Sequence, residues 1–272
     1  MQCPHYGAAK TNPSGHKTAL GYRTFRCSDG KHRFNERTAT PFTNLPLPTA
    51  VVRLVVLWWL RYKLSPRDRA EMFLVRGLAF THETGRDWVA RCAPRITPQL
   101  RAKRQGKVGG SWRVDEAYVR IAGRGHYLYR AIDRAGNLVD SLLSKTRDMA
   151  AAKQFFKGAK KVTGCKPQKV TTDGHNSYPR AIRSILGRKV LRRTNRYLNN
   201  RIEQDHRGMK QRYYPMRGLG NFAGAARFCR ACDEQRSYFR ARTKPKETVS
   251  MAEQRRVFRQ RFAALQESLI AA

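Results

Sequence analysis

Apolar and polar residues follow three different patterns along the chain, and each pattern predicts a different kind of structure. Residues 1–47 are mostly polar, are rich in turn-forming residues and lead into a proline-rich stretch. Residues 49–100 carry apolar positions at helical spacing, whereas residues 111–143 alternate in the manner of β-strands. Helical segments with one further strand follow to the end. The sequence therefore predicts several modules of different secondary structure.

The helical region is expected to form three short helices. The first opens at Thr49, Ser65 caps the second, and Thr81 caps a third that we expect to stop before Pro94. This order is typical of a helix-turn-helix DNA-binding domain over residues 48–100, and a plain three-helix bundle is the alternative. The third helix would contact DNA through two basic residues, Arg86 and Arg91.

The first residues of the chain resemble a small zinc ribbon, in which two Cys-x-x-Cys knuckles share one tetrahedral ion. Each knuckle here keeps its first cysteine and lacks its second, and the nearby histidines are irregularly spaced. The four candidate zinc ligands are Cys3, His5, Cys27 and His32. We therefore expect residues 1–47 to form a degenerate zinc-ribbon-like segment that has lost its Zn²⁺, with zinc binding by these four residues as the alternative.

From residue 111 onward, the order of the predicted elements is that of one α/β fold. Three strands joined by glycine-containing turns precede a helix at 148–160, and a buried strand and another helix follow. The expected strands are 111–121, 126–133, 138–143 and 169–173. Three meandering strands, a helix and a parallel strand are the order of the ribonuclease-H-like fold. We expect this α/β catalytic domain over residues 111–242, after a basic linker at 101–110 and before a C-terminal helix at 243–272.

The charge of the chain indicates its partner. The sequence holds 56 Lys and Arg residues against 19 Asp and Glu residues, a formal net charge of +37 at pH 7. Such a chain repels itself unless a polyanion neutralises it, and nucleic acid is the polyanion that it would meet in a cell. A merely solubilising basic surface, or a protein bound to a membrane surface, is the alternative. Because the excess charge is spread over the whole chain, we favour nucleic acid.

The cellular location follows from what the sequence lacks. No secretory signal is visible, and the most apolar run, residues 51–60, is about half a membrane span in length. The six cysteines show no disulfide framework. We therefore expect a cytoplasmic, nucleoid-associated protein with reduced thiols and no membrane partner.

Three acidic residues stand out in so basic a chain. Asp115 lies within the first predicted strand of the α/β domain, Asp173 ends the fourth, and Glu203 begins a later helix. In the expected fold the first and fourth strands are neighbours, which would bring Asp115 and Asp173 together. Converging carboxylates repel one another unless divalent cations lie between them, and such oxygen ligands suit Mg²⁺. Each acid also has an ordinary alternative: Asp173 begins a common Asp-Gly turn, and Glu203 is placed to pair with Arg207 at i+4.

Three blocks of sequence resemble the catalytic blocks of DDE transposases of insertion-sequence family six. The blocks are WRVDEAYV at 112–119 with YLYRAID at 127–133, TTD at 171–173 with Tyr178, and NNRIEQDH at 199–206 with Lys210. Similarity extends over most of residues 34–240, and three blocks in the right order are far more specific than any one of them. The interval from Asp173 to Glu203, 30 positions (203 − 173), is shorter than usual for the family.

The resemblance implies an activity and a set of metal ligands. Asp115, Asp173 and Glu203 would be the catalytic residues and the ligands of two Mg²⁺ ions, with Mn²⁺ as a substitute. The implied enzyme binds double-stranded DNA at the element ends and at the target, cleaves a phosphodiester bond and transfers the strand. Since two ends must be paired, it would act as a homodimer or a higher oligomer on DNA.

The helix of the third block would also contact DNA. The resemblance implies that Lys210 holds a terminal phosphate, and that His206 positions the scissile phosphate, although a structural role for His206 stays open. We expect Arg207 and Arg212 to contact the DNA backbone from the same basic helix.

Two other functions fit the same sequence. A non-catalytic DNA-binding regulator, or an inactive transposase remnant, would bind DNA without regard to Mg²⁺ or to the three acids. A structure-specific nuclease with the same fold would cleave DNA without joining it, and would have little use for a helix-turn-helix module.

Overall fold

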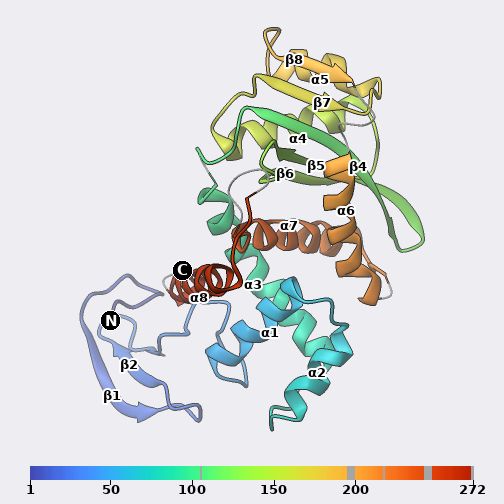
Figure 1. The fold of residues 1–272 in the computed structure, drawn as a ribbon. Coiled ribbons are helices and arrows are strands. Elements are labelled where there is room, and N and C mark those ends of the chain that lie inside the picture. Colours follow the sequence, from blue (N-terminus) through green and yellow to red (C-terminus); the bar gives the residue numbers. More distant parts are fainter. Residues whose placement is uncertain (105, 195–199, 217, 242–246, 271–272) are drawn as a thin grey trace.

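The structure is a computed structural model of the 272-residue chain, and it describes residues 1–104, 106–194, 200–216, 218–241 and 247–270. Its parts are stacked in the order N-terminal strands, helices and a second, larger sheet (Figure 1). The N-terminal strands β1 (Thr11–Lys17), β2 (Arg23–Cys27) and β3 (Arg33–Phe34) form an antiparallel sheet in the order β1-β2-β3. Its core is small and consists of Cys3, Cys27 and Phe34 with two half-buried neighbours.

Three helices follow, and the caps predicted from the sequence begin the second and the third. They are α1 (Thr49–Arg61), α2 (Pro66–Leu74) and α3 (His82–Ala102). Ser65 accepts a hydrogen bond from the backbone N–H of Asp68, whose carboxylate accepts one from the Ser65 N–H, which is a complete capping box. Thr81 accepts a hydrogen bond from the N–H of Thr84 at the start of α3.

Helix α3 does not stop before Pro94, so that prediction is wrong. The helix continues through Pro94 and Pro98 to Ala102 and takes up the beginning of the expected linker. Both prolines are exposed and lie four residues apart, so both missing N–H groups fall on one side of the helix. The opposite side keeps its apolar stripe, with Ile96 and Leu100 each 1% exposed, and packs against α7 (Phe222–Tyr238). Tertiary packing thereby offsets two lost backbone hydrogen bonds.

The larger sheet has the strand order expected for the ribonuclease-H-like fold. Its strands are β4 (Ser111–Ile121), β5 (Arg124–Asp133), β6 (Leu138–Ser144), β7 (Lys169–Thr172) and β8 (Leu191–Thr194). The order across the sheet is β6-β5-β4-β7-β8, with β4, β5 and β6 antiparallel and β7 and β8 parallel to β4. The sequence did not predict β8, because Leu-Arg-Arg-Thr has no buried alternation and all four residues are exposed on the edge of the sheet.

Helices cover both faces of this sheet (Figure 1). Helices α4 (Met149–Thr163) and α5 (Ser177–Ile185) share a core with Trp112 and Val114 of β4. Residues of the opposite parity, Ala117 and Val119, share the other core with α7 and with α6 (Asn200–Tyr213). The two cores follow from the two-residue alternation of a strand that is buried on both sides.

The helical module and the sheet share one of these cores. Helix α7 contacts α1 and α3 on one side and β6 on the other, and Cys229 and Cys232 are buried there as packing residues. A short 3-10 turn, η2 (Tyr214–Met216), follows α6. The last helix, α8 (Met251–Ile270), docks on this core through Phe258 and Phe262. In the part of the chain that the structure describes, no helix combines the length and the apolar character needed to span a membrane.

Candidate active site

The register of two neighbouring strands brings Asp115 and Asp173 together. Strands β4 and β7 run parallel with Arg113 opposite Thr171, so two residues further on Asp115 comes level with Asp173 at the carboxyl end of β7. Oxygen atoms of Asp115, Glu116 and Asp173 all lie within 4.8 Å of one another. Their side chains range from Glu116, 2% exposed, through Asp115, 16%, to Asp173, 35%, so the cluster opens to solvent on the Asp173 side.

Glu116 is a member of this cluster that sequence reasoning did not single out. Successive strand residues point to opposite faces of a sheet, so an acid directly after Asp115 is not expected to approach the same point. The guanidinium of Arg147, which lies in the loop between β6 and α4, links the carboxylate of Glu116 to that of Asp173. Its Nη2 donates to Glu116 Oε2 at 3.1 Å and to Asp173 Oδ2 at 2.6 Å. The adjacent Asp-Glu pair at 115–116 was the one visible signal.

Helix α6 brings the third predicted block to the same place. His206 Nδ1 lies 3.6 Å from Asp115 Oδ2. Glu203, three residues earlier and exposed, lies outside the 4.8 Å group but is near enough for its charge to act on Asp115. Lys210, half-buried and one turn after His206, also acts on the imidazole electrostatically. Asn199, the first residue of that block, falls outside the described residues.

The site is electrostatically unfavourable for the carboxylate of Asp115. Burial raises the pKa of Asp115 to about 7, and repulsion from Glu116, Asp173 and Glu203 adds to the effect. Burial lowers the pKa of His206 to about 3, with a further contribution from the nearby Arg130, so its imidazole is neutral at physiological pH. A neutral ring offers one N–H donor and one acceptor, and its Nε2 is buried with no hydrogen-bond partner among the described residues.

This donor set fits a hard divalent cation. All three atoms of the group are carboxylate oxygens, the ligands that Mg²⁺ and similar ions prefer. A cation among them would also relieve the repulsion that raises the pKa of Asp115. Within the described part of the chain, this is the only group of three or more acidic, histidine or cysteine side chains close enough to share an ion.

The four zinc candidates are only partly gathered. Cys3 and Cys27 are buried together in the N-terminal core, while the rings of His5 and His32 lie with their centroids 6.4 Å apart. Tyr6 stacks on His32 at 5.9 Å. No three of these four residues bring their ligand atoms as close together as the three acids of the cluster do.

The basic residues predicted to contact DNA fall into two groups. Arg86 and Arg91 on α3 and Arg207 on α6 are exposed, and Arg91 also donates to the carbonyl of Thr43 at 3.0 Å. Arg212, in contrast, is 6% exposed. It donates from Nε to the carbonyl of Leu60 at 3.3 Å and from Nη2 to that of Trp59. This buried position does not agree with the prediction that Arg212 contacts the DNA backbone. Its guanidinium instead donates hydrogen bonds to the last carbonyls of α1.

The chain is similar in sequence to a known family of proteins. Residues 109–241 match a family model described as a DDE domain. The chain is 42% identical over 166 residues to the transposase for the insertion sequence-like element IS431mec of Staphylococcus aureus, a match that covers 60% of this chain and 73% of that protein. Identity and coverage are the same for the transposase for the insertion sequence element IS257 in transposon Tn4003, also from Staphylococcus aureus.

Among solved structures, the chain is distantly similar to the catalytic core domain of HTLV-2 integrase in complex with magnesium, in its dimeric form. That match has 16% identity and a TM-score of 0.32, and covers 39% of this chain and 71% of that one. A simian T-cell lymphotropic virus intasome in complex with the PP2A regulatory subunit B56 gamma matches with 13% identity and a TM-score of 0.36, over 46% of this chain and 49% of that one. From the matched domain and the staphylococcal relatives, the chain belongs to the DDE transposases of insertion-sequence family six.

Proposed function

We propose that this transposase cleaves and rejoins DNA phosphodiester bonds at the acidic cluster, with Asp115, Asp173 and Glu203 as its catalytic residues. The observation that carries the proposal is the convergence of Asp115 and Asp173 from neighbouring parallel strands, beneath a helix that presents Glu203 and His206. Three acidic side chains within 4.8 Å of one another, with Glu203 close enough to act on Asp115, repel one another, and a metal-dependent phosphoryl transfer would give them a function.

The three acids would hold two Mg²⁺ ions, or Mn²⁺ in their place. When bound, such ions neutralise charge on the phosphate and activate the attacking oxygen. Arg147 holds the Asp173 carboxylate in place through its 2.6 Å contact. The neutral imidazole of His206 faces Asp115. It is suited to forming a hydrogen bond rather than an ion pair. Lys210, one turn further along α6, would bind a DNA phosphate.

The reaction that fits this site has two steps. In the first, water attacks the phosphodiester at the element end, and the bond to the leaving 3′ oxygen breaks to give a free 3′ hydroxyl. In the second, that hydroxyl attacks a phosphodiester of the target, so one bond is broken for each one formed. The two steps are the same in-line displacement, so one set of carboxylates serves both and no covalent protein–DNA intermediate is needed.

DNA recognition would lie mainly outside the acidic cluster. We propose that residues 48–100 act as a helix-turn-helix module, with the exposed Arg86 and Arg91 of α3 directed at DNA and Arg207 contacting the backbone from α6. The N-terminal sheet would be the remnant of a zinc ribbon. Because two ends of an element must be joined in one event, at least two copies of the chain would assemble on DNA.

One assay distinguishes this function from its competitors. The protein is incubated with a labelled duplex that carries an element end, a target plasmid and Mg²⁺, and joined products are separated on a gel. We expect joining by the wild type and a loss of at least about a thousandfold in Asp115→Asn and Asp173→Asn, with end binding retained. Glu253→Gln, which removes an exposed acid on α8, is the matched control.

The other possible results of this joining assay indicate different functions. Binding without any reaction would indicate a regulator or an inactive copy, and cleavage without joining would indicate a nuclease. Joining that survives Asp115→Asn would refute the assignment of the site.

A further inference from the structure

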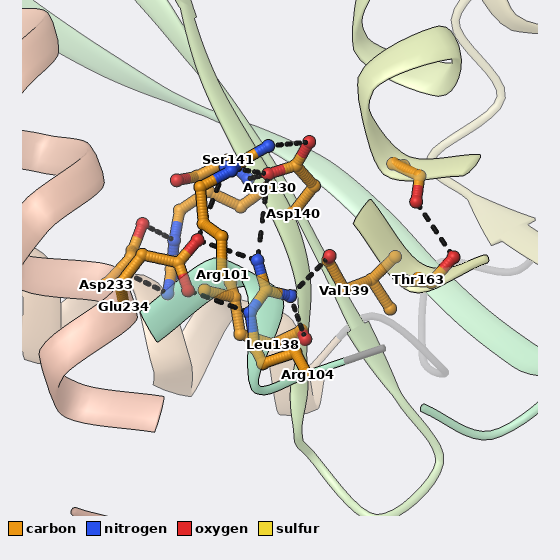
Figure 2. A network of polar contacts seen from close by, with 11 residues as sticks. Arg101, Arg104, Arg130, Leu138, Val139, Asp140, Ser141, Thr163, Asp233 and Glu234 are labelled. Carbon is orange, nitrogen blue, oxygen red and sulfur yellow. Dashed lines mark hydrogen bonds and ion pairs between the residues drawn. The ribbon is translucent and has the colours of Figure 1, made fainter. Parts of the chain in front are cut away.

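A buried arginine on the central sheet lies directly beside the candidate active site. Arg130 of β5 is the cross-strand partner of Asp115 on β4. Opposed residues of an antiparallel pair point to the same face, so both side chains lie on the face that α6 and α7 cover. Arg130 is 1% exposed. Its Nε and Nη2 donate to the two oxygens of Asp233 on α7 at 3.0 and 2.7 Å (Figure 2).

The same guanidinium also reaches α6. Arg130 Nη2 donates to Asp205 Oδ2 at 2.5 Å. The other oxygen of Asp205 lies 2.6 Å from Arg236 Nη2 of α7, and Arg236 Nη1 donates to the backbone carbonyl of Asp205 at 2.9 Å. Two elements thus hold the side chain and the backbone of one α6 residue. Asp205 lies two residues after Glu203 and directly before His206.

This attachment complements a second one at the far end of α6. Arg212 fixes the last turn of the helix to the carbonyls of α1. Ile202 and Met209 are also buried on α6, but apolar packing is non-directional and does not define the rotation of a helix as a hydrogen bond does. A guanidinium that donates to a carboxylate has a fixed direction, so the contact at Asp205 defines the rotation of the first half of α6.

We propose that Arg130 and Asp205 are positioning residues, which fix the rotation of α6 so that Glu203 and His206 lie over Asp115. The inference rests on the proposed function, because it takes Glu203 to be a metal ligand. Neither Arg130 nor Asp205 would touch DNA or metal. They act through Glu203, in the way that outer hydrogen bonds orient the ligands of metal sites, where their loss typically weakens metal binding about 10- to 100-fold.

Helix α7 contains a matched control for this idea. Glu234, next to Asp233 on α7, is 1% exposed and accepts hydrogen bonds from Arg101 and Arg104 of the α3 region (Figure 2). Arg101 also pairs with Asp140 of β6 at 2.7 Å. This second ion-pair group resembles the first in burial and chemistry, but within the described part of the chain it makes no hydrogen bond or ion pair with α6. Its disruption should lower stability without moving Glu203.

The test measures Mn²⁺ binding by calorimetry on the full chain, together with thermal unfolding. Asp205→Asn and Arg236→Gln are each made in the wild type and in Glu203→Gln. We expect both to weaken Mn²⁺ binding by about tenfold in the wild type and by less than about twofold when Glu203 is already replaced. Glu234→Gln should lower the midpoint of unfolding and leave Mn²⁺ binding within about twofold. The side chain of Arg236 is 41% exposed, so its replacement is expected to disturb the fold less than Asp205→Asn. Arg236→Gln therefore tests the positioning role if Asp205→Asn fails to fold.

The possible failures are distinguishable. If Glu203→Gln alone leaves Mn²⁺ binding unchanged, the proposed ligand set is wrong. If Glu203→Gln weakens binding but Arg236→Gln and Asp205→Asn do not, only the positioning role is overturned. An equal loss in Asp205→Asn and Glu234→Gln would show that the effect is a general consequence of instability.

Discussion

Replacing Asp115 with asparagine should inactivate the enzyme and, in the absence of divalent metal, make its fold more stable. The carboxylate lies among three other acids, and burial together with their repulsion raises its pKa from the ordinary 3.8 to about 7. Asparagine has nearly the same shape and carries no charge. The substitution therefore removes the repulsion and retains most of the packing.

The magnitude follows from the pKa. A difference of about three pKa units corresponds to roughly 4 kcal/mol at about 1.4 kcal/mol for each unit, and we expect about 1–3 kcal/mol because the site is partly solvated. The folded-state pKa of Asp115 lies above that of the unfolded chain, so ionisation favours unfolding. This penalty is absent below about pH 4, grows as the pH rises, and is complete above about pH 7. The benefit of asparagine should follow the same course.

Urea unfolding and thermal unfolding, both with EDTA at pH 4, 6 and 8, measure this difference in stability. At pH 8 the midpoint of thermal unfolding of Asp115→Asn should rise by a few degrees, and at pH 4 the two proteins should agree. Added Mn²⁺ should stabilise the wild type and not the variant. Asp173→Asn is the control, since it breaks the ion pair with Arg147 and should not stabilise the fold. An Asp115→Asn protein no more stable than the wild type at pH 8 would refute the reasoning.

Three further predictions concern the metal, the helices and the N-terminus. Because Asp115 must lose its proton to bind a cation, Mn²⁺ affinity should increase up to about tenfold per pH unit below pH 7 and level off above it, as calorimetry in two buffers would show. Arg212→Met should lower the free energy of unfolding by about 2–3 kcal/mol and leave the salt dependence of DNA binding unchanged, whereas Arg86→Gln and Arg91→Gln should each reduce that slope by about one. Elemental analysis should find no stoichiometric zinc, and zinc that disappears on Cys3→Ser would contradict the interpretation of a degenerate ribbon.

The first strand of the larger sheet was predictable because its buried residues alternate with more exposed ones, whereas β5 and β6 are buried along most of their length. In β4, Trp112 and Val114, and then Ala117, Val119 and Ile121, are buried between more exposed neighbours, and glycine-containing turns separate β4, β5 and β6. The topology then places Asp115 beside Asp173 without any knowledge of side chains. A convergence of this kind depends only on strand order and register, which a sequence pattern can indicate.

Features that depend on contacts between distant residues could not be predicted in this way. Helix α3 passes through Pro94 because α7, more than a hundred residues later, packs on its other side. Arg212 has the spacing of a DNA-contacting residue, yet it is buried against carbonyls of α1. Arg147 lies in a loop with no pattern of its own. Its role at the acidic cluster is visible only once Glu116 and Asp173 are brought together.

The acids of this chain have two different environments. Some form the electrostatically unfavourable acidic cluster, and others form ion pairs that fix the arrangement of the helices. Besides the acidic cluster, buried or half-buried acids such as Asp205, Asp233 and Glu234 are paired with arginines around α7. Buried ion pairs contribute little net stability because desolvation opposes their attraction, but they fix direction. The acids of the cluster, in contrast, share the arginine Arg147 between Glu116 and Asp173, and they repel one another at Asp115. On the proposed function, the protein gives up stability at a place where a bound cation would restore it, and its paired acids hold the surrounding helices around that place.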